Sequence, residues 1–218
     1  MPGRMIEDRL REEYFDLLPD MRRVAWQLEA EVRYHTLPIL HRLTHYEQLV
    51  VSSRVKECES AIKTLRRRQE GRTFDPERPE EYSVLNLPDL AGVRVLTFPH
   101  ARLIEVDDAL RGTDCFTGWT SDPVKDEEGT VLAHTYYGYF EKVSEKVRAE
   151  YQVVPMLIGL FWEVEHSAIY KPAPSLKGIA ESEDMKRLKT DVERALSRFE
   201  AGFESFVRDN TDSPSKAS

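Results

Sequence analysis

The feature that most constrains the fold of this 218-residue sequence is the alternation of strand-like and helix-like segments after residue 92. The run VRVLTF is rich in β-branched residues and lies between Gly92 and Pro99, which is typical of a buried strand. We expect, in order, a strand at 93–98, a helix at 101–111, two or three strands within 116–152 joined by an acidic turn at 126–129, and a helix at 156–170. This order predicts a mixed β-sheet flanked by helices, in an α/β or α+β domain.

Apolar residues at helical spacing also predict helices at both ends of the chain. Two amphipathic helices open the sequence, separated by Pro19 and Asp20. The segment YEQLVVSS is compatible with a strand or with the end of a helix. A final helix is expected near 183–208, and its continuous apolar stripe either covers the domain core or mediates oligomerisation. The predicted organisation is N-terminal helices at 1–45, a core domain at 46–172, a long C-terminal helix at 180–208 and a disordered tail at 209–218.

The composition indicates a soluble globular protein, with 32% charged and 40% hydrophobic residues. No stretch approaches the roughly 20 apolar residues of a membrane span, and the first residues lack a secretory signal, so we expect a cytoplasmic protein. Cys58 and Cys115 form no CxxC or Cys/His cluster in the sequence, which suggests neither a disulfide framework nor a zinc site. The net charge of −8 argues against indiscriminate nucleic-acid binding.

Separated basic and acidic motifs point to phosphoryl or pyrophosphoryl transfer. This chemistry requires cations around the phosphates, carboxylates that hold Mg²⁺ and an aligned acceptor hydroxyl. The segments SSRVKECESAIKTLRRR, DLAGVRVLTF, YYGYF and EYQVVPMLIGLFWEVEHSAIYKP occur, between about residues 50 and 172, in the order and spacing of one known family. Through them the chain resembles the RelA/SpoT synthetase domain, which implies a nucleotidyltransferase-like fold.

The resemblance implies a role for each matching residue. ATP would be bound by Arg54, Lys56, Ser60, Lys63 and Arg94, magnesium and catalysis would rest on Asp89 and Glu150, and the acceptor would be bound by Tyr136 and Gln152. Arg54 and Arg94 would clamp the adenine, because a guanidinium stacks well on a base. Taken alone, the basic segment also fits a solvated helix face, and Asp89 also fits a turn residue after Pro88.

The most informative stretch is EYQVVPMLIGLFWEVEH with the residues that follow it. Seven of its positions match the family in one register: Glu150, Gln152, Trp162, Glu165, His166, Tyr170 and Lys171. We expect Glu165 and His166 to have structural roles in a helix, and Lys171 to be a favourable charge at a helix end.

Two departures from the family concern the acceptor side. Val154 and Pro155 stand where the family has arginine and threonine, so one cation is missing. In the family motif G-Y-x-S-[VIL]-H, Tyr136 would keep the stacking ring, while Gly138 and Phe140 replace the serine and the histidine. Recognition of the acceptor's own phosphates is therefore in doubt.

The resulting expectation is a Mg²⁺-dependent ATP diphosphokinase of the GTP diphosphokinase type. It would transfer the β,γ-pyrophosphate of ATP to the 3′-hydroxyl of GDP or GTP and make the stringent-response alarmone (p)ppGpp. No histidine is followed by aspartate, so the hydrolase motif is missing and a synthetase-only short form, expected to be a homo-oligomer, fits.

Two alternatives stay open. In the toxic branch of the family the acceptor is the 3′ CCA end of tRNA, with an antitoxin as partner; Arg66, Arg67, Arg68 and Arg72 would then contact the RNA. The other alternative is a catalytically inactive regulator that binds a nucleotide or a protein.

Overall fold

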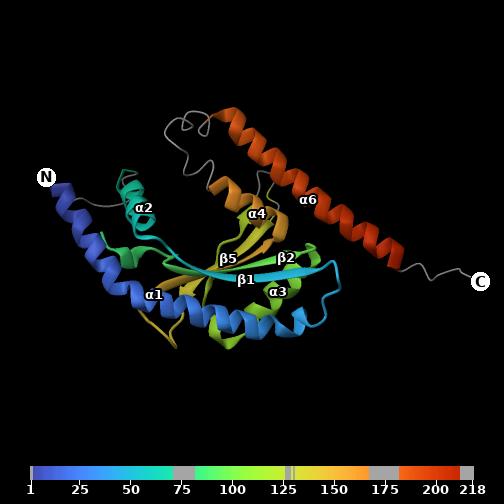
Figure 1. Cartoon of the computed structure of the whole chain (residues 1–218), viewed down its shortest axis with the longest axis horizontal. Helices are drawn as coiled ribbons and strands as arrows, with labels where there is room; N and C mark the ends of the chain where they lie inside the picture. The colour runs from blue at the N-terminus through green and yellow to red at the C-terminus, as the bar shows by residue number, and fades with distance from the viewer. Residues whose placement is uncertain (1, 71–81, 126–128, 130, 167–181, 212–218) are drawn as a thin grey trace, which may run out of the picture.

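The computed structural model describes residues 2–70, 82–125, 129, 131–166 and 182–211 (Figure 1). The helices are α1 (Pro2–Leu40), α2 (Cys58–Glu70), η2 (Val84–Asn86), α3 (Ala101–Arg111), η3 (Asp114–Phe116), α4 (Met156–Glu165) and α6 (Glu183–Thr211). The strands are β1 (Gln48–Val55), β2 (Ala91–Phe98), β3 (Thr120–Ser121), β4 (Val124–Lys125), β5 (Val131–Tyr139) and β6 (Arg148–Pro155). The mixed β-sheet flanked by helices, predicted from the sequence, is confirmed.

The sheet has the strand order β1-β2-β6-β5-β3, and β4 also pairs with β5. β2 and β6 run parallel in the centre, while every other pairing is antiparallel. The central strands are buried at most positions, which explains why their sequences are rich in branched apolar residues.

Helices cover both faces of the sheet. α1 and α3 lie on one face, and α4 with α6 lies on the other (Figure 1). The large apolar core lies between the sheet, α1 and α3, whereas only a small cluster of Leu96, Ala133, Val154 and Ile158 lies beneath α4. The face under α4 therefore has room for polar side chains.

Within the described residues, no helix combines the length and the apolar character needed to cross a membrane.

The N-terminal segment differs from its prediction, because α1 is one continuous helix that contains Pro19. A proline inside a helix removes one backbone hydrogen bond. Here the buried stripe that includes Leu17, Met21 and Val24 continues across the proline and packs on the core, so packing holds the helix together. The segment YEQLVVSS, which the sequence allowed to be a strand or the end of a helix, lies largely in strand β1.

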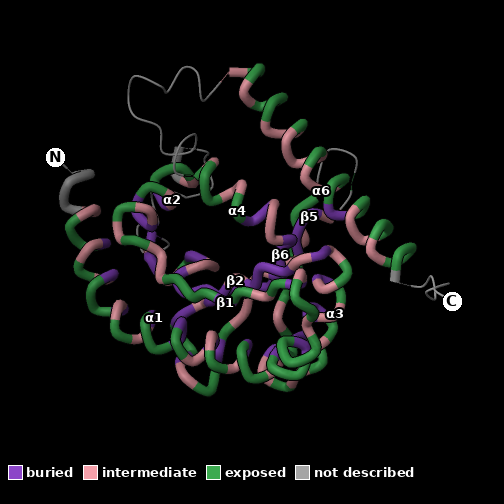
Figure 2. The backbone as a smooth tube through the Cα atoms, turned by 45° about the vertical axis from the view of Figure 1, so that its right-hand side comes forward, coloured by how far each residue is buried: buried purple, intermediate pink, exposed green. Residues whose placement is uncertain are grey.

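α6 confirms the long C-terminal helix, but its apolar stripe is only partly covered. Leu188, Phe199 and Phe206 are exposed, and Glu200 is the single buried side chain among those described on this helix. Most of α6 is exposed or half-buried (Figure 2). Glu200 accepts a hydrogen bond from the backbone N–H of Leu157, at the start of α4 (3.3 Å). Glu204 accepts one from Ala101 at the start of α3. A carboxylate at a helix N-terminus is favourable, so the Glu204 carboxylate helps to hold α6 against α3.

Replacing Glu200 by glutamine should stabilise the protein at pH 8. Burial, together with the charge of Glu204, raises the pKa of Glu200 to about 7, although the Leu157 bond opposes the shift. A carboxyl with a raised folded pKa contributes stability below about pH 4.5 that is lost as pH rises through about 7. Glutamine removes this loss, on the order of 3 kcal/mol. Urea unfolding at pH 5 and pH 8 measures it; an equal pH dependence in both proteins would contradict the assignment.

Candidate active site

Alternating residues of four strands form a polar patch on the face that carries α4. Residues paired across neighbouring strands point to the same face of a sheet. One row across β1, β2, β6 and β5 consists of Arg54, Gly92, Glu150 and Tyr137, and the next consists of Ser52, Arg94, Gln152 and Thr135. Five of the residues expected in the site are thus brought onto adjacent strands or close beside them: Arg54, Asp89, Arg94, Glu150 and Gln152.

Gly92 allows the first row to close. A Cβ at this position would lie 2.9 Å from Cγ of Glu150, so the Glu150 side chain lies directly over the glycine. From there its carboxylate pairs with the Arg54 guanidinium on the far side of β2. Glu150 is only 3% exposed, and burial raises its pKa, as does the nearby Asp89, whereas Arg54 lowers it.

Asp89 and Lys56 form a second ion pair beside the first. Lys56 follows β1, and Asp89 stands two positions before the first residue of β2. Nζ of Lys56 lies 2.5 Å from a carboxylate oxygen of Asp89. Both side chains are largely covered, with 16% and 20% exposure. The site therefore joins two carboxylates to two cations at one end of the central strands.

The second row continues toward α4 through Arg94. Its Nε donates to Oε1 of Gln152 (3.0 Å), and its guanidinium lies 3.7 Å from Glu163 on α4. Burial and the neighbouring Arg54 lower the pKa of Arg94. A cavity of about 700 Å³ lies beside both arginines and is also lined by Trp162. A planar ligand in this cavity would meet two guanidinium groups.

Ser60 and Lys63 lie on α2, whereas Lys56 precedes this helix, which begins at Cys58. Lys63 is exposed, and Ser60 is half-buried. The apolar side of α2 packs into the core through Ala61, Ile62 and Leu65.

Tyr136 is the one expected site residue that lies on the wrong face. It is buried, its hydroxyl donates to Oδ1 of Asp107 (2.8 Å), and its ring stacks on Tyr151 in the main core. A shift of one residue along a strand moves a side chain to the opposite face. Tyr137, which was not predicted as a site residue, takes the position on the site face. Burial, followed by the charges of Glu150 and Asp89, raises the pKa of Tyr137 to about 12.

The two other departures from the family motif, at Gly138 and Phe140, also lie on the core side of the sheet. Phe140 belongs to the main core, and a Cβ at Gly138 would lie 2.5 Å from the ring of Trp119. Both positions therefore serve packing.

Val154 is fully buried under α4, in contact with the small apolar cluster. The position where the family has a cation is thus occupied by an apolar side chain of the core. Arg148, two residues before Glu150, points to the same face of β6, and in the strand register it lies opposite Tyr139 of β5. Arg148 and Tyr139 were not predicted as site residues, because the family motif does not include them. Only the alternation of side chains along the two strands places them on the site face.

The end of the matched segment contacts both α6 and the cavity. Nε1 of Trp162 donates to Glu193 of α6 (2.7 Å), and Glu165 lies 3.4 Å from Lys189 of the same helix. Trp162, Glu165 and His166 also line the cavity beside the two arginines. The structural role expected for Glu165 and His166 stays a prediction. Tyr170 and Lys171 lie outside the described residues, as do Arg72 and the turn at 126–128.

No protein-family model matches the sequence, and no curated protein matches it. Solved structures do. The small alarmone synthetase 1 from Bacillus subtilis has 15% sequence identity and a TM-score of 0.66, over 93% of this chain and 100% of its own. The same enzyme bound to its product pppGpp gives 18% and 0.61, over 89% and 96%. A GTP pyrophosphokinase family protein from Streptococcus pneumoniae gives 18% and 0.61, over 91% and 94%. The chain has the small alarmone synthetase fold.

Proposed function

We propose that this chain, with its alarmone synthetase fold, is a nucleotide 3′-pyrophosphokinase that transfers the β,γ-pyrophosphate of ATP to the 3′-hydroxyl of GDP or GTP. One observation carries the proposal: Asp89 and Glu150 lie beside each other at the central strands, each paired with a cation, next to a cavity flanked by two arginines. The neighbours bound to AMPCPP and to pppGpp support nucleotide substrates for this fold.

The donor would occupy the cavity beside Arg54 and Arg94. Its adenine would lie between the two guanidinium groups, which gains about 1 kcal/mol or more from each stacked contact. The polyphosphate would extend toward Lys56 and Lys63, because several cations are needed to offset its charge. This arrangement uses four of the five residues expected on the donor side and assigns no role to Ser60.

Asp89 and Glu150 fit a magnesium site by their donor chemistry. Mg²⁺ in phosphoryl-transfer enzymes is commonly held by one or two carboxylates together with oxygens of the substrate. When bound, the ion would add positive charge where the transferred phosphates develop negative charge. Lys56 and Arg54 balance the two carboxylates in its absence.

Glu150 is the group placed to receive the proton of the acceptor hydroxyl. Burial raises its pKa, which makes this carboxylate a stronger proton acceptor than an exposed glutamate. The 3′-oxygen would form a bond to the β-phosphorus, the bond from that phosphorus to the α-phosphate oxygen would break, and AMP would leave. The protein's part is to align the hydroxyl and to keep water out.

The acceptor would lie on the β5 side of Glu150. Tyr137 offers a ring for the base, and Arg148 offers a cation for the 5′-phosphates in place of the one missing at Val154. Tyr139 lies between them on the same face. This assignment replaces Tyr136 by Tyr137 and keeps Gln152 at the centre of the site.

Substitutions at Tyr137 and Tyr136 should distinguish the roles of these two neighbouring residues. Tyr137→Ala should lower kcat/KM for the acceptor by about 10- to 100-fold, because stacking on a base contributes roughly 1–3 kcal/mol. Tyr136→Phe should leave kcat/KM nearly unchanged and lower the melting temperature, since it removes only the bond to Asp107. Steady-state kinetics with varied acceptor measures both. The reverse ranking would return the acceptor role to Tyr136.

The proposed reaction is tested by following two labels. ATP labelled at the α- or at the γ-phosphate is incubated with Mg²⁺ and GDP, GTP or deacylated tRNA. Pyrophosphoryl transfer to the acceptor moves the γ label onto it and leaves the α label in AMP. Labelling of tRNA alone would favour the toxic alternative, in which Arg66 and Arg67 of α2 contact RNA. Absence of label on every acceptor would favour the inactive regulator.

A further inference from the structure

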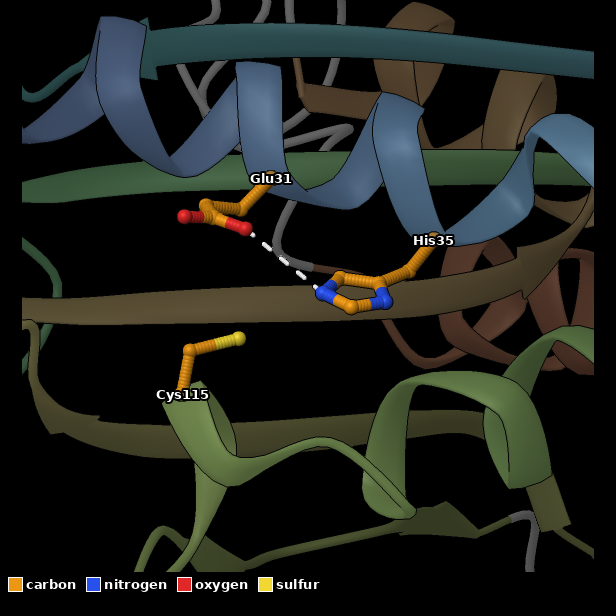
Figure 3. A group of neighbouring side chains, drawn as sticks. All are labelled: Glu31, His35 and Cys115. Carbon is orange, nitrogen blue, oxygen red and sulfur yellow. Dashed lines mark ion pairs between the residues drawn. The ribbon is translucent and has the colours of Figure 1, made fainter.

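A second cluster of reactive side chains lies on the opposite side of the sheet from the candidate active site. Glu31 and His35 stand one turn apart on α1, and Cys115 of η3 faces them (Figure 3). One ligand atom from each residue lies within 4.8 Å of the others, and all three residues are half-buried. In the part of the chain that the structure describes, this is the only group of three such residues.

The spacing of these atoms matches a tetrahedral metal site after a small movement. Oε2 of Glu31 lies 3.5 Å from Nε2 of His35. With metal bonds of about 2.1 Å to both atoms, two corners of a tetrahedron are about 3.4 Å apart. The helix thus already holds two ligands at the required separation. Cys115 must approach by roughly 1 Å, which a side-chain rotation can supply.

The types of ligand select the metal. A thiolate, an imidazole and a carboxylate form a mixed set that suits zinc, whereas Mg²⁺ and Ca²⁺ prefer oxygen atoms alone. The three residues leave one tetrahedral position. They line a hollow of about 410 Å³ together with Asp114 and Lys142, so water can reach that position.

From this geometry we propose that Glu31, His35 and Cys115 bind one Zn²⁺ ion, which links the middle of α1 to the turn after α3. Cys115 stands 80 positions after His35 and 84 after Glu31, so the local sequence does not show that the cysteine lies beside the other two residues. The site does not involve the residues proposed for pyrophosphoryl transfer. Its role is to fasten α1 to η3, and Phe116 of η3 packs on Tyr151 of the central strand β6.

Cobalt tests the site, because a thiolate bound to Co²⁺ gives an intense near-ultraviolet charge-transfer band that carboxylates alone do not give. Protein stripped with a chelator should develop this band with one equivalent of Co²⁺ and lose it when Zn²⁺ is added. Excess Mg²⁺ should leave it intact. Zn²⁺ at about 100 times its Kd should raise the melting temperature by about 5–10 °C.

Variants assign the ligands. Cys115→Ser should abolish the band, and His35→Gln or Glu31→Gln should weaken Zn²⁺ binding at least about 100-fold, more than the loss of an outer partner. Cys58→Ser, which removes the other free cysteine, should bind as the parent does. Lys142→Gln should bind more tightly, because it removes a repelling charge. The proposal is overturned if the parent gives no band, if the band survives Cys115→Ser, or if Cys58→Ser abolishes it.

Discussion

Replacing Glu150 by glutamine is expected to lower kcat by about 10³-fold or more, an increase in barrier of roughly 4 kcal/mol. The substitution keeps the shape of the side chain over Gly92 and removes the proposed proton acceptor, which is also a proposed magnesium ligand. It should not cost stability. Burial raises the pKa of Glu150, so its stabilising contribution is present below about pH 4.5 and is lost at higher pH. Near-normal turnover in this variant would remove the catalytic assignment.

A second buried glutamate provides the matched control. Glu47 accepts a hydrogen bond from Thr44 and pairs with Arg102, and these contacts outweigh burial and lower its pKa. Its stabilising contribution is therefore present at neutral pH and lost as pH falls. Glu47→Gln should cost about 1–2 kcal/mol of unfolding free energy and leave kcat unchanged. Asp89→Asn should behave like Glu150→Gln.

Replacing Val154 by arginine is expected to destabilise the protein by about 3–5 kcal/mol, the cost of an uncompensated buried charge. The family motif would suggest the reverse, because arginine is its usual residue here. In this chain Val154 is fully buried against Leu96 and Ile158 beneath α4. Urea unfolding followed by circular dichroism measures the loss.

Val154→Met separates the charge from the added volume. Methionine is flexible and apolar, so it should cost clearly less than arginine at the same site. An arginine variant as stable as the parent, with unchanged acceptor kinetics, would show that position 154 can open toward the site.

The elements that were predicted well are those with strong local signals. The β-branched run before Pro99 is strand β2, and the periodic segments at 101–111 and 183–208 lie in α3 and α6. The motifs also singled out Arg54, Lys56, Asp89 and Glu150, but not their pairing. That Asp89 pairs with Lys56 and Glu150 with Arg54 is known only from the structure.

The predictions for Tyr136 and Pro19 differ from the structure for one physical reason. Both positions are determined by contacts with residues that are distant in the sequence. Tyr136 and Tyr137 are both aromatic residues of β5, and only the register with β6 decides which of them faces the site. Pro19 was read as a break, although buried packing on both sides keeps α1 continuous. Neither fact can be read from the residues around it.

The parallel pairing of β2 with β6 has a consequence for how the protein is made. Arg94 and Gln152 are paired across these strands although they stand 58 positions apart in the chain. Contacts of such long range form more slowly than helices, because the intervening chain must first lose its freedom. During synthesis, α1, α2 and α3 leave the ribosome before β6. A nascent chain thus carries Arg54 and Lys56 well before Glu150 joins them, and the candidate site is complete only once the last central strand has paired.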